Sequence, residues 1–183
     1  MKYMQYGGMQ NQPLMRLTLY FTLFFLFGFW VTNFAMYFAK MSLTPQSVVD
    51  YYLGSEAEFR LPRTYQSMLE VTHTHLPMMA LVMLVLTHLL IFSAFQYRTK
   101  VTFISLAFLA ALLHETAGWL VRFVHPAFAW LKVTTFVVMQ AMLAFLLGAL
   151  LLLLWRGQRG QGNGGEKTQL PNATMESTKQ RSL

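Results

Sequence analysis

The stretch Glu70–Phe95, EVTHTHLPMMALVMLVLTHLLIFSAF, decides the fold that this sequence predicts. It contains an apolar run long enough for a membrane-spanning helix, which needs about 20 residues. It places His73 and His75 at the start of that run and His88 deep inside it. Ionisable side chains are costly in the hydrocarbon interior of a membrane, so three histidines on one such helix indicate a functional site.

The composition of the chain indicates an integral membrane protein. Of its 183 residues, 55% are hydrophobic and 11% are charged, whereas a soluble domain carries about 25% charged residues. Long apolar runs predict membrane-spanning helices at about residues 17–39, 70–96, 101–124 and 133–155. We therefore expect an all-α, four-transmembrane-helix bundle over residues 17–155. A cytoplasmic N-terminal segment (1–16) precedes it, and a disordered cytoplasmic tail (156–183) follows it.

The distribution of basic residues predicts how the bundle is oriented. With a cytoplasmic N-terminus, nine Lys and Arg residues lie on the inner side and five on the outer side. Because basic residues concentrate on the cytoplasmic side, we predict a multi-pass protein of the bacterial inner membrane with both termini in the cytoplasm. Its first partner is then the lipid bilayer. The net charge of +7 does not predict nucleic-acid binding, since the basic residues lie at the ends of apolar runs.

One sizeable periplasmic loop, residues 40–69, is expected on the outer side of the membrane. Part of this loop has the signals of a short helix. Ser42 or Thr44 before Pro45 is a helix-start signal, and Gly54 is a typical helix end.

The sequence leaves two starting points open for the second span. Ser67-x-x-Glu70 matches a capping box, which would start the helix near Met68. Pro77 would then fall about two turns inside the helix and kink it. Alternatively the helix starts at Leu76, with the proline in its tolerated first turn. The choice decides where the two preceding histidines point.

All five histidines fall at two depths if the second and third spans form a hairpin that turns near residue 99. His88 then lies level with His114 near mid-membrane, and His73 or His75 lies level with His125 near the outer surface. Imidazoles that face each other from two helices are typical of a protein that binds one or two haems b, because neutral imidazole is a good axial ligand of haem iron. Small residues of the third span would leave room for the porphyrin: Ala110, Ala111, Ala117 and Gly118.

Charged residues near these histidines predict supporting roles. Arg122 would neutralise haem propionates at the outer depth, as would Arg63 or Lys132. Glu115 is a carboxylate inside the membrane and is a candidate for proton transfer or for pairing with Arg122. Glu70, at the outer rim, is a candidate for bonding a histidine that ligates a metal or for protonating a quinol.

Two alternatives to haem remain open. His73 and His75 are followed by Met78 and Met79, and a mixture of imidazole and thioether ligands suits copper(I). The other alternative is a cofactor-free structural subunit of a larger membrane complex. The absence of cysteine excludes thiolate metal sites, CxxCH haem attachment and disulfides.

The segment from residue 44 to residue 92 resembles a family of small bacterial four-helix inner-membrane proteins similar to b-type cytochrome membrane subunits. The matching elements are Tyr51-Tyr52-x-Gly54, Leu69-Glu70-Val71-Thr72-His73-x-His75 and His88. The resemblance implies functional roles for His73, His75 and His88. The resemblance also implies that the protein acts together with electron-transfer proteins. We therefore predict a membrane electron-transfer subunit that links the quinone pool to redox-complex subunits or a periplasmic cytochrome, rather than an independent enzyme.

Overall fold

The computed structural model describes residues 13–162 of the chain, with side chains for residues 13–155. This part is helical, and its elements are α1 (Pro13–Phe38), α2 (Pro45–Leu53), α3 (Tyr65–Ile91), α4 (Tyr97–Phe123), the 3₁₀ turn η3 (Pro126–Phe128) and α5 (Ala129–Gly162). Four segments are long and apolar enough to cross a membrane. The prediction of an all-α bundle with four membrane spans is therefore confirmed, and the chain is a multi-pass membrane protein.

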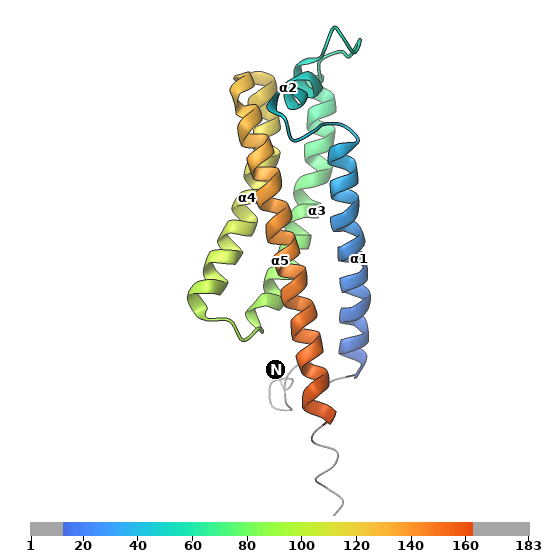
Figure 1. Cartoon of the computed structure of the whole chain (residues 1–183), viewed down its shortest axis with the longest axis vertical. Coiled ribbons are helices and arrows are strands. Elements are labelled where there is room, and N and C mark those ends of the chain that lie inside the picture. The colour runs from blue at the N-terminus through green and yellow to red at the C-terminus, as the bar shows by residue number, and fades with distance from the viewer. Residues whose placement is uncertain (1–12, 163–183) are drawn as a thin grey trace, which may run out of the picture.

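The four long helices run up and down along one axis, and α2 lies across one end of the bundle (Figure 1). We call this the α2 end. α5 is the central helix and packs against α1, α3 and α4. The start of α1 and the end of α5 both lie at the opposite end (Figure 1). Residues 1–12 of the expected N-terminal segment and residues 163–183 of the expected tail lie outside the described residues.

The short helix α2 has the boundaries that its sequence predicts. The Thr44 side chain accepts a hydrogen bond from the backbone N–H of Ser47, and Pro45 is the first helical residue. Gly54 ends the helix with φ at 89°, a conformation that favours glycine. A Cβ atom at this position would lie 2.7 Å from the carbonyl oxygen of Arg60, so only glycine fits.

The second span begins earlier than either predicted start. α3 begins at Tyr65, and its N-cap is Thr64, whose side chain accepts a hydrogen bond from the backbone N–H of Ser67 at 3.1 Å. The predicted capping box is therefore wrong, and the Glu70 carboxylate instead accepts from the side chain of Gln66. Pro77 lies inside this helix, so the turns before and after the proline belong to one continuous span.

The last span also begins and ends outside its predicted limits of residues 133–155. His125 caps η3 by accepting the backbone N–H of Ala127, and Pro126 is the first residue of the turn. α5 follows directly from Ala129 and extends to Gly162. The first seven residues of the expected disordered tail are therefore helical.

The hairpin of α3 and α4 turns earlier than predicted. Because α3 ends at Ile91 and α4 begins at Tyr97, the turn is centred near residue 94 rather than near residue 99. Each residue of α3 therefore faces a residue of α4 about ten positions earlier than expected, a difference of about 15 Å along the helix. The contact between Tyr65 and Phe123 follows this corrected register.

Candidate functional site

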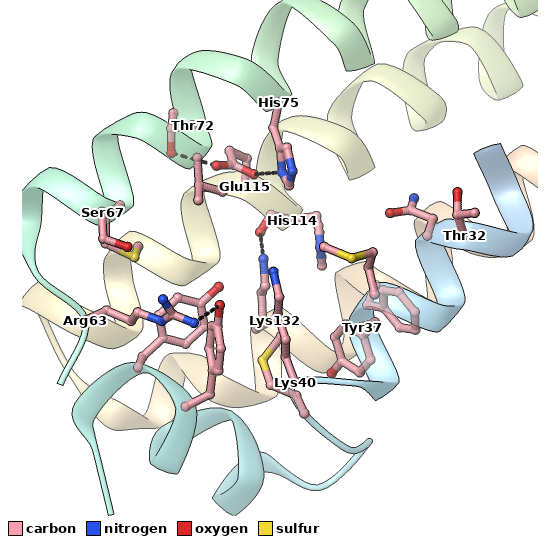
Figure 2. A pocket seen from close by; sticks show the side chains of 18 of the residues that line it. Thr32, Tyr37, Lys40, Arg63, Ser67, Thr72, His75, His114, Glu115 and Lys132 are labelled. Atoms are coloured by element: carbon pink, nitrogen blue, oxygen red, sulfur yellow. Dashed lines mark hydrogen bonds and ion pairs between the residues drawn. The ribbon is translucent and has the colours of Figure 1, made fainter. Parts of the chain in front are cut away.

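A cavity of about 220 Å³ lies inside the α2 end of the bundle. Its walls come from α1, α2, α3, α4 and α5, and Figure 2 shows the side chains that point into it. Its apolar walls include Phe29, Met36 and Phe136. Its polar lining is unusually rich for a space between membrane helices: Thr32, Asn33, Lys40, Tyr51, Tyr52, Arg63, Ser67, Thr72, His75, His114, Glu115 and Lys132.

Glu115 is held between α3 and α4 by side chains of both helices. Thr72 donates its hydroxyl to one carboxylate oxygen at 2.6 Å, and the second oxygen lies 3.5 Å from Nδ1 of His75. Trp119 donates its indole N–H to the Thr72 hydroxyl at 2.8 Å. Thr72 and His75 share one face of α3, because residues three apart are neighbours on a helix. The carboxylate therefore has a fixed orientation at the cavity wall (Figure 2).

The pair formed by Glu115 and His75 connects the cavity to the exterior of the bundle. The Glu115 side chain is 16% exposed, whereas the His75 side chain is 57% exposed. Each group can take up and release a proton, and the two lie close enough to exchange one directly or through a single water. The arrangement can therefore take up, share and release a proton at the cavity wall.

Lys132 places a cation inside the same cavity. Its side chain is buried, at 5% exposed, and its Nζ donates a hydrogen bond of 2.7 Å to the backbone carbonyl of His114. Nζ also lies 5.9 Å from the centre of the Tyr52 ring. A buried ammonium group needs polar partners to offset its lost hydration, and the polar cavity supplies them.

Two buried nitrogen atoms of the cavity wall have no hydrogen-bond partner among the described residues. They are Nδ1 of His114 and Nδ2 of Asn33. Leaving such a group unsatisfied costs about 1–3 kcal/mol, and a native structure normally satisfies it with protein, water or a ligand. Lys132 lines the same cavity, and we call these three residues the donor pole. Asn33 and Lys132 can donate to an oxygen of a ligand, and Nδ1 of His114 can accept from it or, when protonated, donate to it.

At the α2 end, the loop between α1 and α3 is held against α2 and α4 by hydrogen bonds. Arg63 donates from its guanidinium to the Tyr51 hydroxyl at 2.7 Å, and Arg122 donates from Nε to the Arg63 carbonyl at 2.6 Å. Arg122 therefore ties this loop to α4. Tyr52 packs so closely on Gly118 that a Cβ there would lie 2.7 Å from its hydroxyl oxygen, and burial raises the pKa of Tyr52. The space that we predicted for a porphyrin at Gly118 is filled by this tyrosine.

Only two of the five predicted histidines line the cavity, His75 and His114. His73 is exposed on α3. His88 is also exposed, in the last turn of α3, with its ring 5.4 Å from that of Phe92. His125 is exposed and caps η3.

The predicted pairs of imidazoles are not formed, because the hairpin turns about five residues early. His75, rather than His88, lies level with the residues around His114, since it contacts the neighbouring Glu115. His88 lies thirteen residues further along α3, about 20 Å away along the helix. Thr72, Glu115 and Trp119 bond to one another between α3 and α4 at this level. The described side chains therefore do not fit a haem held between facing histidines of these two helices.

The copper ligand set is not gathered either. His73 and His75 are two residues apart on a continuous helix, so they project about 200° apart around it. Met78 is exposed and Met79 is partly buried against the core. Within residues 13–155, no group of three or more His, Asp or Glu side chains is placed to hold a metal ion. Glu70 lies on the exposed side of α3 and does not line the cavity.

Sequence reasoning missed Asn33, Thr72 and Trp119 as residues of the site. It named Lys132 as a partner for haem propionates but placed it outside the membrane, because the fourth span was expected to start after it. The His125-Pro126 pair was the signal for an earlier start, since proline is favoured at the first position of a helix. Thr72 and Trp119 carry no such signal, because their role depends on the register between α3 and α4.

Comparison with known proteins assigns the chain to a family. A family model described as a transmembrane helical domain matches residues 42–161. The match covers α2, α3 and α4 and nearly all of α5, so the chain belongs to this family of transmembrane helical domains. No curated protein and no solved structure matches the chain.

Proposed function

We propose that this protein is a membrane subunit of an electron-transfer complex that binds the ring of a quinol or quinone in the cavity. The observation that supports this best is the contact between Glu115 and His75 at the wall of a cavity inside the bundle. A carboxylate inside a membrane costs free energy to bury, and such residues commonly have a function. Quinols are membrane-soluble and lose protons when they are oxidised, so such a site suits them.

Glu115 and His75, which we call the acid–base pole of the cavity, act on one hydroxyl of the quinol. Oxidation of a quinol to a quinone releases two protons and two electrons. Glu115 accepts one proton from the first hydroxyl and shares it with His75, and Nδ1 of His114, which has no partner in the described residues, takes the second proton from the other hydroxyl. Both protons then leave through the polar cavity towards the α2 end. A general base must lie within hydrogen-bond reach of the proton that it takes, and a ring seated in the cavity meets this condition. The electrons pass to a redox partner protein of the same complex.

The donor pole binds the second oxygen of the ring. His114 and Asn33 contribute their unpartnered nitrogen atoms, and Lys132 contributes an ammonium group. Quinone oxygens accept hydrogen bonds. When they bind here, the buried nitrogen atoms gain partners, and the free-energy cost of leaving these atoms unpaired is removed. The apolar walls at Phe29 and Phe136 then contact the faces of the ring.

The proposal also gives the orientation of the bundle in the membrane. The excess of basic residues at the chain termini favours an inner-membrane protein with both termini in the cytoplasm, so the cavity opens towards the periplasmic side. The chain lacks cysteine, which makes a test simple. A cysteine replacing Phe59, at the α2 end, will react with a membrane-impermeant maleimide on intact spheroplasts. A cysteine replacing Tyr97, at the opposite end, will react only after permeabilisation. The reverse pattern contradicts the orientation.

The binding site is tested with the full-length protein in lipid nanodiscs and a short-chain quinol. Glu115→Gln is expected to weaken quinol binding on the order of tenfold, because a neutral amide oxygen is a weaker hydrogen-bond acceptor than a carboxylate. His88→Gln, an exposed histidine at the other end, is the control and leaves the affinity unchanged. Equal affinities for wild type and Glu115→Gln, or no binding to the wild type, reject the proposal.

Haem b and copper stay predictions, and no step of the proposed reaction passes through them. The same preparation, reduced with dithionite, tests haem by its absorption spectrum. A b-type α-band that disappears in His88→Ala would support the predicted two-depth scheme. It would contradict the register described above.

A further inference from the structure

A second hollow, of about 450 Å³, opens at the α2 end beside the cavity. We call it the mouth, and its main lining residues are Lys40, Tyr51, Arg60, Arg63, Thr64 and Ser67. Four of these also line the cavity: Lys40, Tyr51, Arg63 and Ser67. The mouth and the cavity are therefore adjacent spaces at this end of the bundle.

The mouth lies where a membrane span ends and another begins. Lys40 follows α1, which ends at Phe38, and Arg63 and Thr64 directly precede Tyr65, the first residue of α3. Both helices are candidate membrane spans. The ends of such spans lie at the boundary between hydrocarbon and headgroups, so the mouth is level with the phosphate groups of phospholipids.

The mouth carries an excess of positive charge. Three cations line it, and only Arg60 has a carboxylate partner there, Glu58 at 2.8 Å. Among residues 13–155, no carboxylate pairs with Lys40 or Arg63. Two cations that face one hollow without a counter-charge favour an anion between them.

Arg63 is fixed in position before any ligand arrives. Its guanidinium donates to the Tyr51 hydroxyl at 2.7 Å and lies 4.3 Å from the centre of that ring. Its own carbonyl accepts the bond from Arg122. A guanidinium group held in this way loses little freedom on binding, and its planar fork matches the oxygens of a phosphate.

Apolar side chains beside the mouth point to a lipid. Phe59 and Leu61, next to Arg60, are 96% and 85% exposed. Met36 and Phe38, at the end of α1, also expose about half of their side chains. A free anion would use only the basic residues, whereas a phospholipid would also cover these apolar groups with its chains and glycerol.

We propose that the mouth binds the phosphate group of an anionic phospholipid from the adjoining leaflet. Arg63 and Lys40 contact the phosphate, and the hydroxyls of Thr64 and Ser67 lie on the same wall. The acyl chains extend along the exposed end of α1. The bound headgroup closes the cavity towards the water, whatever the cavity itself holds.

Native mass spectrometry of the full-length protein in detergent, titrated with phosphatidylglycerol, tests this proposal. Arg63→Gln is expected to weaken phosphatidylglycerol binding on the order of tenfold, and Lys40→Gln to weaken it in the same direction. Lys40 is exposed, so its replacement keeps the test valid if the Arg63 variant does not fold. Arg98→Gln, a basic residue beside a span at the opposite end, is the matched control and leaves binding unchanged.

Two further ligands separate the possible sources of the phosphate. Phosphatidylcholine is expected to bind more weakly than phosphatidylglycerol, and inorganic phosphate is expected not to compete at the concentrations used. Equal binding of the two lipids with no effect of Arg63→Gln and Lys40→Gln overturns the proposal. Competition by inorganic phosphate shows a site for a free anion and also overturns it. Quinol binding is measured separately, so failure of one proposal is distinguishable from failure of the other.

Discussion

The two ends of the bundle are built in different ways. At the α2 end, polar side chains bond across helices, as Thr72 does with Glu115 and Lys132 with the carbonyl of His114. At the opposite end, aromatic side chains join the helices, as Phe103 does by stacking on Phe145 at 3.7 Å, and Lys100 of α4 donates to the carbonyl of Ile91 at the end of α3. The apolar contacts of that end require volume and hydrophobicity, whereas the α2 end also requires particular polar groups at particular positions.

The two ends are expected to differ most in the free energy of unfolding that is lost when one aromatic ring is removed from each. Phe136 is buried, stacks on Tyr37 at 3.7 Å and thereby joins α1 to α5. Phe136→Ala should lower the free energy of unfolding by about 3–5 kcal/mol. Phe145→Ala, at the partly buried stack of the other end, should cost less. Thermal unfolding in detergent measures both, and an equal or larger loss for Phe145→Ala contradicts the comparison.

A smaller difference, with opposite signs, is expected at two glycines. Gly118→Ala would push a methyl group into Tyr52 and should destabilise the protein by about 1–3 kcal/mol. Gly148 has no atom within 4 Å of its would-be Cβ. Gly148→Ala should therefore stabilise the helix by about 0.5–1 kcal/mol. The same unfolding measurement decides, and a stable Gly118→Ala variant would show that α2 does not pack on α4 as described.

The smallest difference is expected at two threonines. Thr72→Val removes the hydroxyl between Trp119 and Glu115 and should cost about 1 kcal/mol. Thr116→Val is the control, because its hydroxyl bonds only to the carbonyl of Leu112 in its own helix and its loss should have almost no effect. Equal unfolding temperatures for the two variants would show that the Thr72 hydroxyl does not stabilise a bridge between Trp119 and Glu115.

Much of the fold could be predicted because hydrophobic runs decide where helices cross a membrane. The cap of α2 at Thr44 and its end at Gly54 were also visible, since both depend on local backbone chemistry. The turn between α3 and α4 was misplaced, because α3 ends at Ile91 rather than at residue 96 and the residues from Tyr97 to Lys100 form the first turn of α4 rather than a loop. That single error moved every predicted pair of histidines.

The cavity itself could not be predicted from the sequence. Glu115 was identified, because a carboxylate inside an apolar run is conspicuous. Two of the proposed donors, Asn33 and Lys132, come from α1 and α5, and their place beside Glu115 and His114 depends on how these helices pack, which no local signal records. Lys132 was misplaced for a related reason: its burial is tolerable only where the His114 carbonyl and the polar cavity receive it.

The hydrogen bond from Trp119 to Thr72 gives the molecule a natural optical probe. The indole lies two hydrogen bonds from the Glu115 carboxylate, and indole emission responds to the polarity and charge around the ring. If the other three tryptophans, Trp30, Trp130 and Trp155, are replaced by phenylalanine, the remaining fluorescence will come from the edge of the cavity alone. Its colour and intensity would then report, in real time and without a label, whether the space beside it is wet, charged or filled.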